Sequence, residues 1–79
     1  MQTNEIMPRE SFAQTVAYRI AFTRQDAGLT QEQLSVLVGC GYRANISHLE
    51  CGVQVPNAYT LYKIAQALGV TMESLCEPL

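Results

Sequence analysis

The chain has 79 residues, of which 48% are hydrophobic and 15% charged, and its formal net charge is -2. This length allows one small domain, and the composition predicts a folded chain with a modest core and excludes a disordered one. Apolar runs fall far short of the roughly 20 residues that span a bilayer, and no secretory leader is recognisable, so we expect a cytoplasmic protein without membrane contact. The acidic balance excludes wholesale attraction to nucleic acid, so any DNA binding must depend on a few locally placed cations.

The N-terminal residues 1–8 are polar, show no periodicity and end in a proline. We therefore expect a flexible arm there, followed by one domain over residues 9–79. Two starts of the first helix fit the sequence: a capping box of Ser11 with Gln14, or Pro8 in the first helical position. Apolar positions recur at three- and four-residue intervals and predict the buried face of this helix; they are Phe12, Val16, Ile20, Thr23 and Ala27.

A second helix is predicted over residues 31–38. Thr30 and Gln33 fit a capping box, in which each side chain accepts the backbone N–H of the other residue. Residues 39–41 then break the pattern, because two glycines in three positions permit the positive φ angles of a tight turn. A third helix is expected from position 42 or 43 to Cys51. Two short helices joined by a glycine-containing turn form a helix-turn-helix pattern.

A loop separates the third helix from two further helices. Pro56 disfavours helical structure at the residue before it, and Asn57 suits the N-cap of the fourth helix. The apolar positions of this helix repeat at helical spacing; they are Leu61, Ile64, Ala65 and Leu68, and Gly69 follows them. Thr71 is expected to cap a last short helix through about Cys76. With no strand pattern in the sequence, we predict an all-α fold of five short helices.

Three segments of the sequence resemble the Cro and phage-repressor (Xre-type) family of helix-turn-helix proteins. They are GLTQEQL at residues 28–34, ISHLECG at residues 46–52, and the segment 56–75, which contains TLYKIAQALGV. The resemblance covers residues 16–76. It implies a compact, five-helix, lambda-repressor-like DNA-binding domain with the helix-turn-helix at helices 2 and 3. Such a domain reads operator DNA, commonly as a dimer, with its third helix in the major groove.

The resemblance also implies which side chains meet DNA. Gln31 would contact phosphate at the start of the second helix, where backbone amides favour an anion. Arg43 would read a guanine, because its guanidinium donates to both O6 and N7. The whole set comprises Gln31, Tyr42, Arg43, Ala44, Asn45, Ser47, His48 and Asn57. Ordinary alternatives stay open: Gln31 as a polar first-turn residue, Arg43 as a solvated surface residue, and Asn57 as a helix cap.

Glu50 needs a separate role, because an acid beside a DNA-facing helix would repel phosphate. The resemblance implies that Glu50 pairs with Arg24 of the first helix and braces the third helix. Arg24 is therefore assigned to structure. The remaining cations are Arg9, Arg19, Arg43 and Lys63. Four cations are few for one contact surface on DNA, so we expect two copies of the protein to bind together.

The sequence departs from the family pattern at three places. The segment 31–46 is one residue longer than in the family, and the extra residue lies in the turn between the two helices. The start of the third helix is therefore shifted, and so are the base contacts expected at positions 42 and 43. Val36 and Leu37 are apolar where family members expose charge; they would either pack against the longer turn or form part of an interface. Cys51 replaces an often polar or basic residue, which weakens the contact with the DNA backbone there.

The C-terminal part carries more apolar and aromatic surface than one short segment needs to cover the core, so we expect a homodimer. The expected interface comprises Tyr59, Tyr62, Met72, Leu75, Cys76 and Leu79. Alternatively, Met72 and Leu75 complete the core of a single copy. No cysteine spacing fits a zinc or redox site and no catalytic constellation is present, so we expect no metal, cofactor, small-molecule ligand or enzymatic activity.

We therefore expect a small stand-alone transcriptional regulator that binds a roughly palindromic double-stranded operator as a homodimer. Phage-type repressors, restriction–modification controllers and DNA-binding antitoxins are all of this kind. The alternative is a protein-interaction module that kept the fold and lost DNA binding, which the acidic charge and the apolar Val36, Leu37 and Cys51 would favour. Dependence on Arg43 and a steep salt dependence of DNA binding distinguish the two functions.

Overall fold

The computed structural model describes residues 5–39 and 43–78, without the side chains of Arg43 and Ala44. The expected contacts of Tyr42 and Leu79 therefore lie outside the described residues. Within the described ranges the chain forms helices and no strand, which confirms the all-α prediction. The helices are α1 (Arg9–Asp26), α2 (Gln31–Val38), α3 (Arg43–Glu50), α4 (Ala58–Leu68) and α5 (Met72–Cys76).

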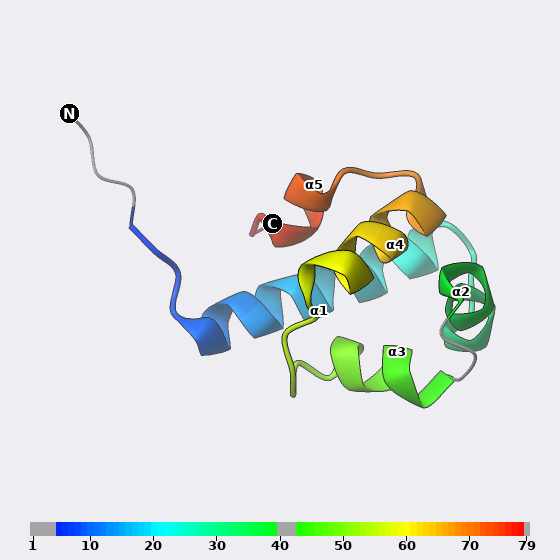
Figure 1. The fold of residues 1–79 in the computed structure, drawn as a ribbon, viewed down its shortest axis with the longest axis horizontal. Helices are drawn as coiled ribbons and strands as arrows, with labels where there is room; N and C mark the ends of the chain where they lie inside the picture. The colour runs from blue at the N-terminus through cyan, green and yellow to red at the C-terminus, as the bar shows by residue number, and fades with distance from the viewer. Residues whose placement is uncertain (1–4, 40–42, 79) are drawn as a thin grey trace.

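Helix α1 is the long element around which the other helices are arranged (Figure 1). It contacts α3 on one side and α5 on another, and α4 crosses it between them. Helix α2 packs against α3 and α4 at the end of the molecule away from the N-terminus. None of the helices in the described part of the chain is both long and apolar enough to cross a membrane.

The start of α1 differs from both predicted alternatives. Pro8 is the N-cap, with an extended backbone (φ -59°, ψ 152°) and no side-chain cap. Its carbonyl accepts the Phe12 N–H at 2.9 Å, so proline lies just outside the helix and still starts its hydrogen-bond ladder. Ser11 falls within the first turn and forms no capping box with Gln14. The fixed φ of proline and its missing N–H suit this boundary, where no intrahelical donor is lost.

The buried face of α1 is also rotated relative to the predicted face. Its buried residues are Ala13, Val16, Ala17, Ile20 and Arg24. Thr23 is only half-buried and Ala27 is exposed beyond the end of the helix, so the predicted stripe is wrong in its last turn. In that turn the core is reached by Arg24, a charged residue that an apolar pattern does not include.

The predicted caps of the next helices are confirmed. Thr30 Oγ1 accepts the Gln33 N–H at 3.0 Å, and Gln33 Oε1 accepts the Thr30 N–H at 2.8 Å. Asn57 and Thr71 each accept the N–H three residues further along the chain, at 2.8 and 3.1 Å. Gly39 ends α2 with a φ of 83°, a left-handed conformation that glycine adopts without steric cost. These local signals fix where α2, α4 and α5 begin.

All five helices contribute to one apolar core. Its buried members are Val16, Ile20, Leu34, Val38, Ile46, Leu49, Leu61, Ile64, Ala65 and Leu75. Leu75 is 1% exposed, so its assignment to a dimer interface is wrong, and the alternative that it completes the core of one copy is correct. Met72 and Cys76 pack against the same core while staying partly exposed.

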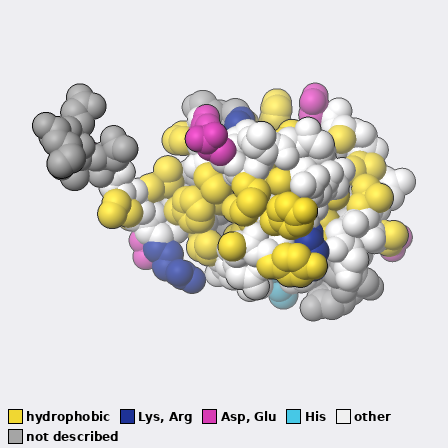
Figure 2. Space-filling model, turned by 45° about the horizontal axis from the view of Figure 1, so that its top comes forward, with side chains coloured by type: hydrophobic (Ala, Val, Ile, Leu, Met, Phe, Trp, Pro, Cys, Tyr) yellow, Lys and Arg dark blue, Asp and Glu magenta, His cyan; other side chains and the backbone are white. Residues whose placement is uncertain are grey.

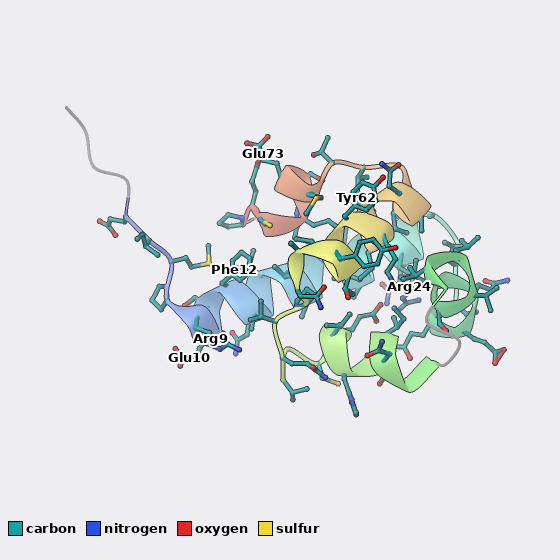
Figure 3. All side chains as sticks on the ribbon, in the orientation of Figure 1. Arg9, Glu10, Phe12, Arg24, Tyr62 and Glu73 are labelled. Carbon is teal, nitrogen blue, oxygen red and sulfur yellow. The ribbon has the colours of Figure 1, made fainter. Side chains whose placement is uncertain are left out.

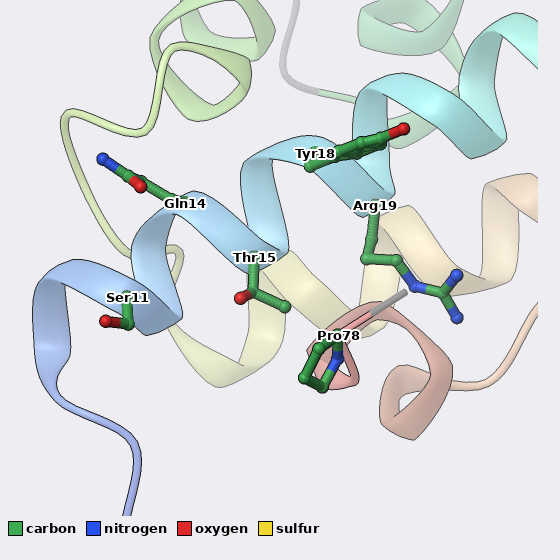
Figure 4. Close-up of a pocket in the computed structure, with 6 residues that line it drawn as sticks. All are labelled: Ser11, Gln14, Thr15, Tyr18, Arg19 and Pro78. Atoms are coloured by element: carbon green, nitrogen blue, oxygen red, sulfur yellow. The ribbon is translucent and has the colours of Figure 1, made fainter.

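A side-chain hydrogen bond adds to the apolar packing of α5 against α1. Arg19 Nε donates to the Ser74 carbonyl at 2.7 Å, and Figure 4 shows Arg19 reaching from α1 toward the C-terminal segment that includes Pro78. Arg19 Nε is therefore held against α5, and the place of Arg19 among the cations available to DNA stays a prediction. The hydrogen bond satisfies a carbonyl of a helix too short to form a long ladder of its own.

Candidate nucleic-acid interface

Helix α3 divides its residues between the core and the surface. Ile46 is fully buried and Leu49 is 4% exposed, so this side of the helix faces α1 and α2. His48 is exposed, and Asn45 and Ser47 are half-buried. Helical spacing therefore leaves a polar face on the outside of the helix-turn-helix.

The C-terminal end of α3 is braced by an ion pair with α1. Arg24 Nε donates to Glu50 Oε2 at 2.6 Å, and Arg24 Nη2 donates to Glu50 Oε1 at 2.9 Å. The two side chains are only 10% and 7% exposed. Arg24 Nη1 also donates to the Leu29 carbonyl at 2.7 Å, which ties the loop before α2 to the same group. The hydrogen bond with Glu50 raises the pKa of Arg24 above its ordinary value despite the opposing effect of burial, so Arg24 stays charged.

Gln31 belongs to this network. Its Nε2 donates to Glu50 Oε1 at 2.9 Å, so the Glu50 carboxylate accepts hydrogen bonds from both α1 and α2. The sequence pattern does not predict this contact, because the two residues are 19 positions apart and only packing of the helices brings them together. One N–H of the Gln31 amide is used by Glu50, which leaves the other to donate elsewhere. Arg24 lies between α1 and the helix-turn-helix in Figure 3.

The loop after α3 carries one further residue of the expected DNA-binding set, Asn57. Asn57 is exposed, and its Oδ1 is taken by the cap of α4. The Asn57 side-chain amide therefore retains N–H donors that the cap does not use. Cys51 is also exposed, directly after α3.

The face over α4 and α5 carries a band of hydrophobic side chains (Figure 2). Tyr59 and Tyr62 are 67% and 47% exposed, and their stacked rings lie 6.4 Å apart. Lys63 Nζ lies 4.7 Å from the centre of the Tyr59 ring, a cation–π distance.

On α5, burial raises the pKa of the Cys76 thiol, and the negative charge of Glu77 raises it further. The hydrophobic residues expected at an interface thus differ in burial, from exposed tyrosines to partly covered Met72 and Cys76.

A second apolar surface lies on α2, away from the core. Val36 and Leu37 are 69% and 58% exposed. Together with Leu29, Glu32 and Gln33 they line a shallow groove. This exposure favours the interface alternative for Val36 and Leu37 over packing against the turn.

Within residues 5–39 and 43–78, no three His, Cys, Asp or Glu side chains gather as metal ligands would.

The sequence and the fold are similar to those of helix-turn-helix regulators. A family model described as a helix-turn-helix domain matches residues 17–76. The uncharacterized HTH-type transcriptional regulator y4dJ of Sinorhizobium fredii is 40% identical over 63 residues, which cover 80% of each chain.

Two solved structures have a similar fold. The hypothetical transcription factor NHTF from Neisseria superposes with a TM-score of 0.81 at 26% identity, over 99% of this chain and 88% of that chain. An HTH_3 family transcriptional regulator from Vibrio cholerae gives a TM-score of 0.79 at 25% identity, over 86% of this chain and 38% of that chain.

Proposed function

Because this chain belongs to the Xre-type helix-turn-helix transcriptional regulators, we propose that it is a sequence-specific regulator that inserts α3 into the major groove of an operator. The observation that carries the proposal is the bracing of α3: Arg24 and Gln31 hold Glu50 at its end, while the polar side of the helix faces outward. A recognition helix fixed in this way meets DNA without first having to be ordered, which lowers the entropic cost of binding.

In this proposal α3 supplies the base contacts. Arg43 donates to a guanine, and Asn45 and His48 reach bases or phosphates from the same helix. Tyr42 and Ala44 complete the expected base-facing positions, Ala44 against a thymine methyl group. Sequence would then be read by one short helix.

Phosphate contacts surround these base contacts. Gln31 donates its remaining N–H to a phosphate at the start of α2, while its other N–H stays on Glu50. Ser47 and Asn57 donate to the backbone strand beside the end of α3. These contacts fix the position of the domain on the duplex and carry no base information themselves.

We further propose that two copies bind together. Tyr59 and Tyr62, with the partly exposed Met72 and Cys76 and with Leu79, form the self-complementary face, because this band carries exposed aromatic surface. A two-fold dimer of this kind would place two α3 helices about 34 Å apart, on successive major grooves of a roughly palindromic site. Two copies also double the small number of cations that one copy offers.

The alternative function is a protein-interaction module on the same fold. The observation that favours it is the exposed apolar groove of Leu29, Val36 and Leu37 on α2, together with the acidic charge of the chain. Such a module would bind a partner protein through α2 and would show no preference among DNA sequences.

The experiment is fluorescence anisotropy with two labelled duplexes, the DNA upstream of the protein's own gene and a scrambled control, at several salt concentrations. Wild type is compared with Arg43→Ala and with Arg43→Lys, which keeps the charge and removes the planar fork. We expect Arg43→Ala to lose about 1–3 kcal/mol of binding free energy on the specific site. Arg43→Lys should lose discrimination between the duplexes while keeping a salt dependence close to that of wild type.

A selection from random duplexes guards against a wrong choice of operator. An enriched, palindromic sequence supports the regulator. Failure to enrich any sequence, together with weak and unselective binding to both duplexes, would exclude the regulator and favour the interaction module.

A further inference from the structure

We propose that Arg9, at the start of α1, binds a DNA phosphate from a groove between α1 and the loop after α3, and so extends the contact surface beyond the helix-turn-helix. This inference rests on the proposed DNA binding. It adds a residue that the family resemblance does not place among the DNA contacts.

The loop after the recognition helix is packed onto the beginning of α1. Gly52 turns the chain with a φ of 74°, a conformation that side chains rarely adopt. A Cβ built on Gly52 would lie 3.6 Å from Gln14 Cγ and 3.8 Å from the Ala13 carbonyl oxygen. The two segments therefore lie close together, because a side chain at position 52 would be in van der Waals contact with α1.

A groove follows this contact. Its α1 side includes Arg9, Glu10 and Gln14, and its loop side includes residues 53–55. Figure 3 shows Arg9 and Glu10 below the first turn of α1, on the side of that helix where α3 lies. A duplex lying along the outer face of α3 would pass this groove as it leaves the recognition helix.

Arg9 is the cation whose head group is available at this place. It is exposed, and among the described residues it takes part in no ion pair. Arg24 is held by Glu50, Arg19 donates to the Ser74 carbonyl, and Lys63 lies over the Tyr59 ring on α4. The groove also offers the side-chain amides of Gln14 and Gln54, which are neutral hydrogen-bond donors.

The neighbouring Glu10 provides an internal check on the geometry. It lines the same groove and carries the opposite charge. If a phosphate approaches this groove, loss of the Arg9 charge weakens binding and loss of the Glu10 charge strengthens it. If the groove faces away from DNA, both charges are screened by salt beyond about 10 Å and neither change matters.

The test compares wild type with Arg9→Gln, Glu10→Gln and the control Glu73→Gln, which makes the same change as Glu10→Gln at an exposed position of α5, on the other side of α1 from Arg9 and Glu10 (Figure 3). Affinity for the selected operator and for scrambled DNA is measured by anisotropy at several salt concentrations. We expect Arg9→Gln to weaken binding to both duplexes by about fivefold for each copy on the DNA, the upper range for one exposed ion pair. The slope of log K against log salt should fall by about 0.9 for each phosphate that the variant no longer neutralises. Glu10→Gln should bind more tightly, and Glu73→Gln should match wild type.

Ethylation interference gives an independent readout of position. Ethylation of one phosphate at each outer edge of the site should weaken binding of the wild type and should no longer affect binding of Arg9→Gln. Ethylation of the phosphates near α3 should weaken binding of both proteins. Normal wild-type binding with an unchanged Arg9→Gln would overturn this inference alone, and so would equal gains in affinity in Glu10→Gln and Glu73→Gln. Absence of sequence-selective binding by wild type would overturn the proposed function and this inference with it. Thermal unfolding by circular dichroism checks that the variants, all at exposed or half-exposed positions, remain folded.

Discussion

Glu50 at the end of α3 accepts two hydrogen bonds from Arg24 of α1, although the two residues are 26 positions apart. The carboxylate also accepts a hydrogen bond from Gln31 of α2, so three helices meet at one buried charge. This arrangement fixes the orientation of the helix that we propose reads DNA, and it explains how an acid is accommodated next to such a helix. Its negative charge is compensated by Arg24, inside the fold.

Replacing Arg24 with Met should destabilise the fold by about 3–5 kcal/mol, because Glu50 would stay buried without its partner. Urea unfolding followed by circular dichroism measures this loss. The double variant Arg24→Met/Glu50→Met should be more stable than the sum of the two single variants predicts, since neither charge is then left alone. Gln31→Ala is the milder control and should cost about 1 kcal/mol. If Arg24→Met lowers the free energy of unfolding by less than Gln31→Ala does, the role assigned to the pair is contradicted.

Two substitutions of Asn57 separate its role as the N-cap of α4 from its proposed contact with a DNA phosphate. Asn57→Ala removes the cap of α4 and should lower the free energy of unfolding by about 1 kcal/mol. Asn57→Asp keeps an acceptor that caps as well as asparagine, so stability should be retained. If the proposed phosphate contact exists, the added negative charge weakens DNA binding in Asn57→Asp. Equal DNA affinity of Asn57→Asp and wild type would leave Asn57 as a cap only.

Leu75 and Tyr62 should respond in opposite ways to substitution. Leu75 is buried, so Leu75→Ala should destabilise the fold by about 2–5 kcal/mol. Tyr62 is 47% exposed, so Tyr62→Glu should leave the thermal transition nearly unchanged and shift a dimer toward monomer. Analytical ultracentrifugation measures the second effect, with Gln25→Glu as a control that adds the same charge on α1. If the wild type is a monomer in solution and its complex with DNA contains one copy of the protein, the proposed α4–α5 interface is ruled out.

The two described cysteines should differ in reactivity. Cys51 is exposed, whereas Cys76 is partly buried. Because burial and the Glu77 charge raise the pKa of Cys76, its reactive thiolate is scarcer at neutral pH than for an unperturbed thiol. Iodoacetamide at pH 7.5, followed by peptide mapping, should modify Cys51 first, and the rate at Cys76 should keep rising as the pH increases. Equal rates at the two sites near neutral pH would be inconsistent with the packing of α5.

The local structure of this chain can be predicted from short stretches of its sequence. Thr30, Asn57 and Thr71 cap the helices that they were predicted to cap, because a cap needs only a side-chain oxygen and an N–H three residues further along. Gly39 and Gly69 end helices for an equally local reason, the positive φ that glycine tolerates. The helix-turn-helix family could likewise be identified from short strings, since those strings encode these caps, ends and apolar spacings.

Contacts between side chains of different helices, in contrast, follow from the packing of the helices and could not be predicted from local patterns. Leu75 is a core residue, Arg19 binds the Ser74 carbonyl, and Gln31 shares Glu50 with Arg24. The last turn of α1 shows why: Arg24 reaches the interior there because Glu50 of a distant helix compensates its charge, whereas an apolar pattern predicts Thr23 and Ala27. Local rules depend on residues a few positions apart. Burial and long-range hydrogen bonds depend on how whole helices pack, and packing can place a paired charge where hydrophobicity alone would not.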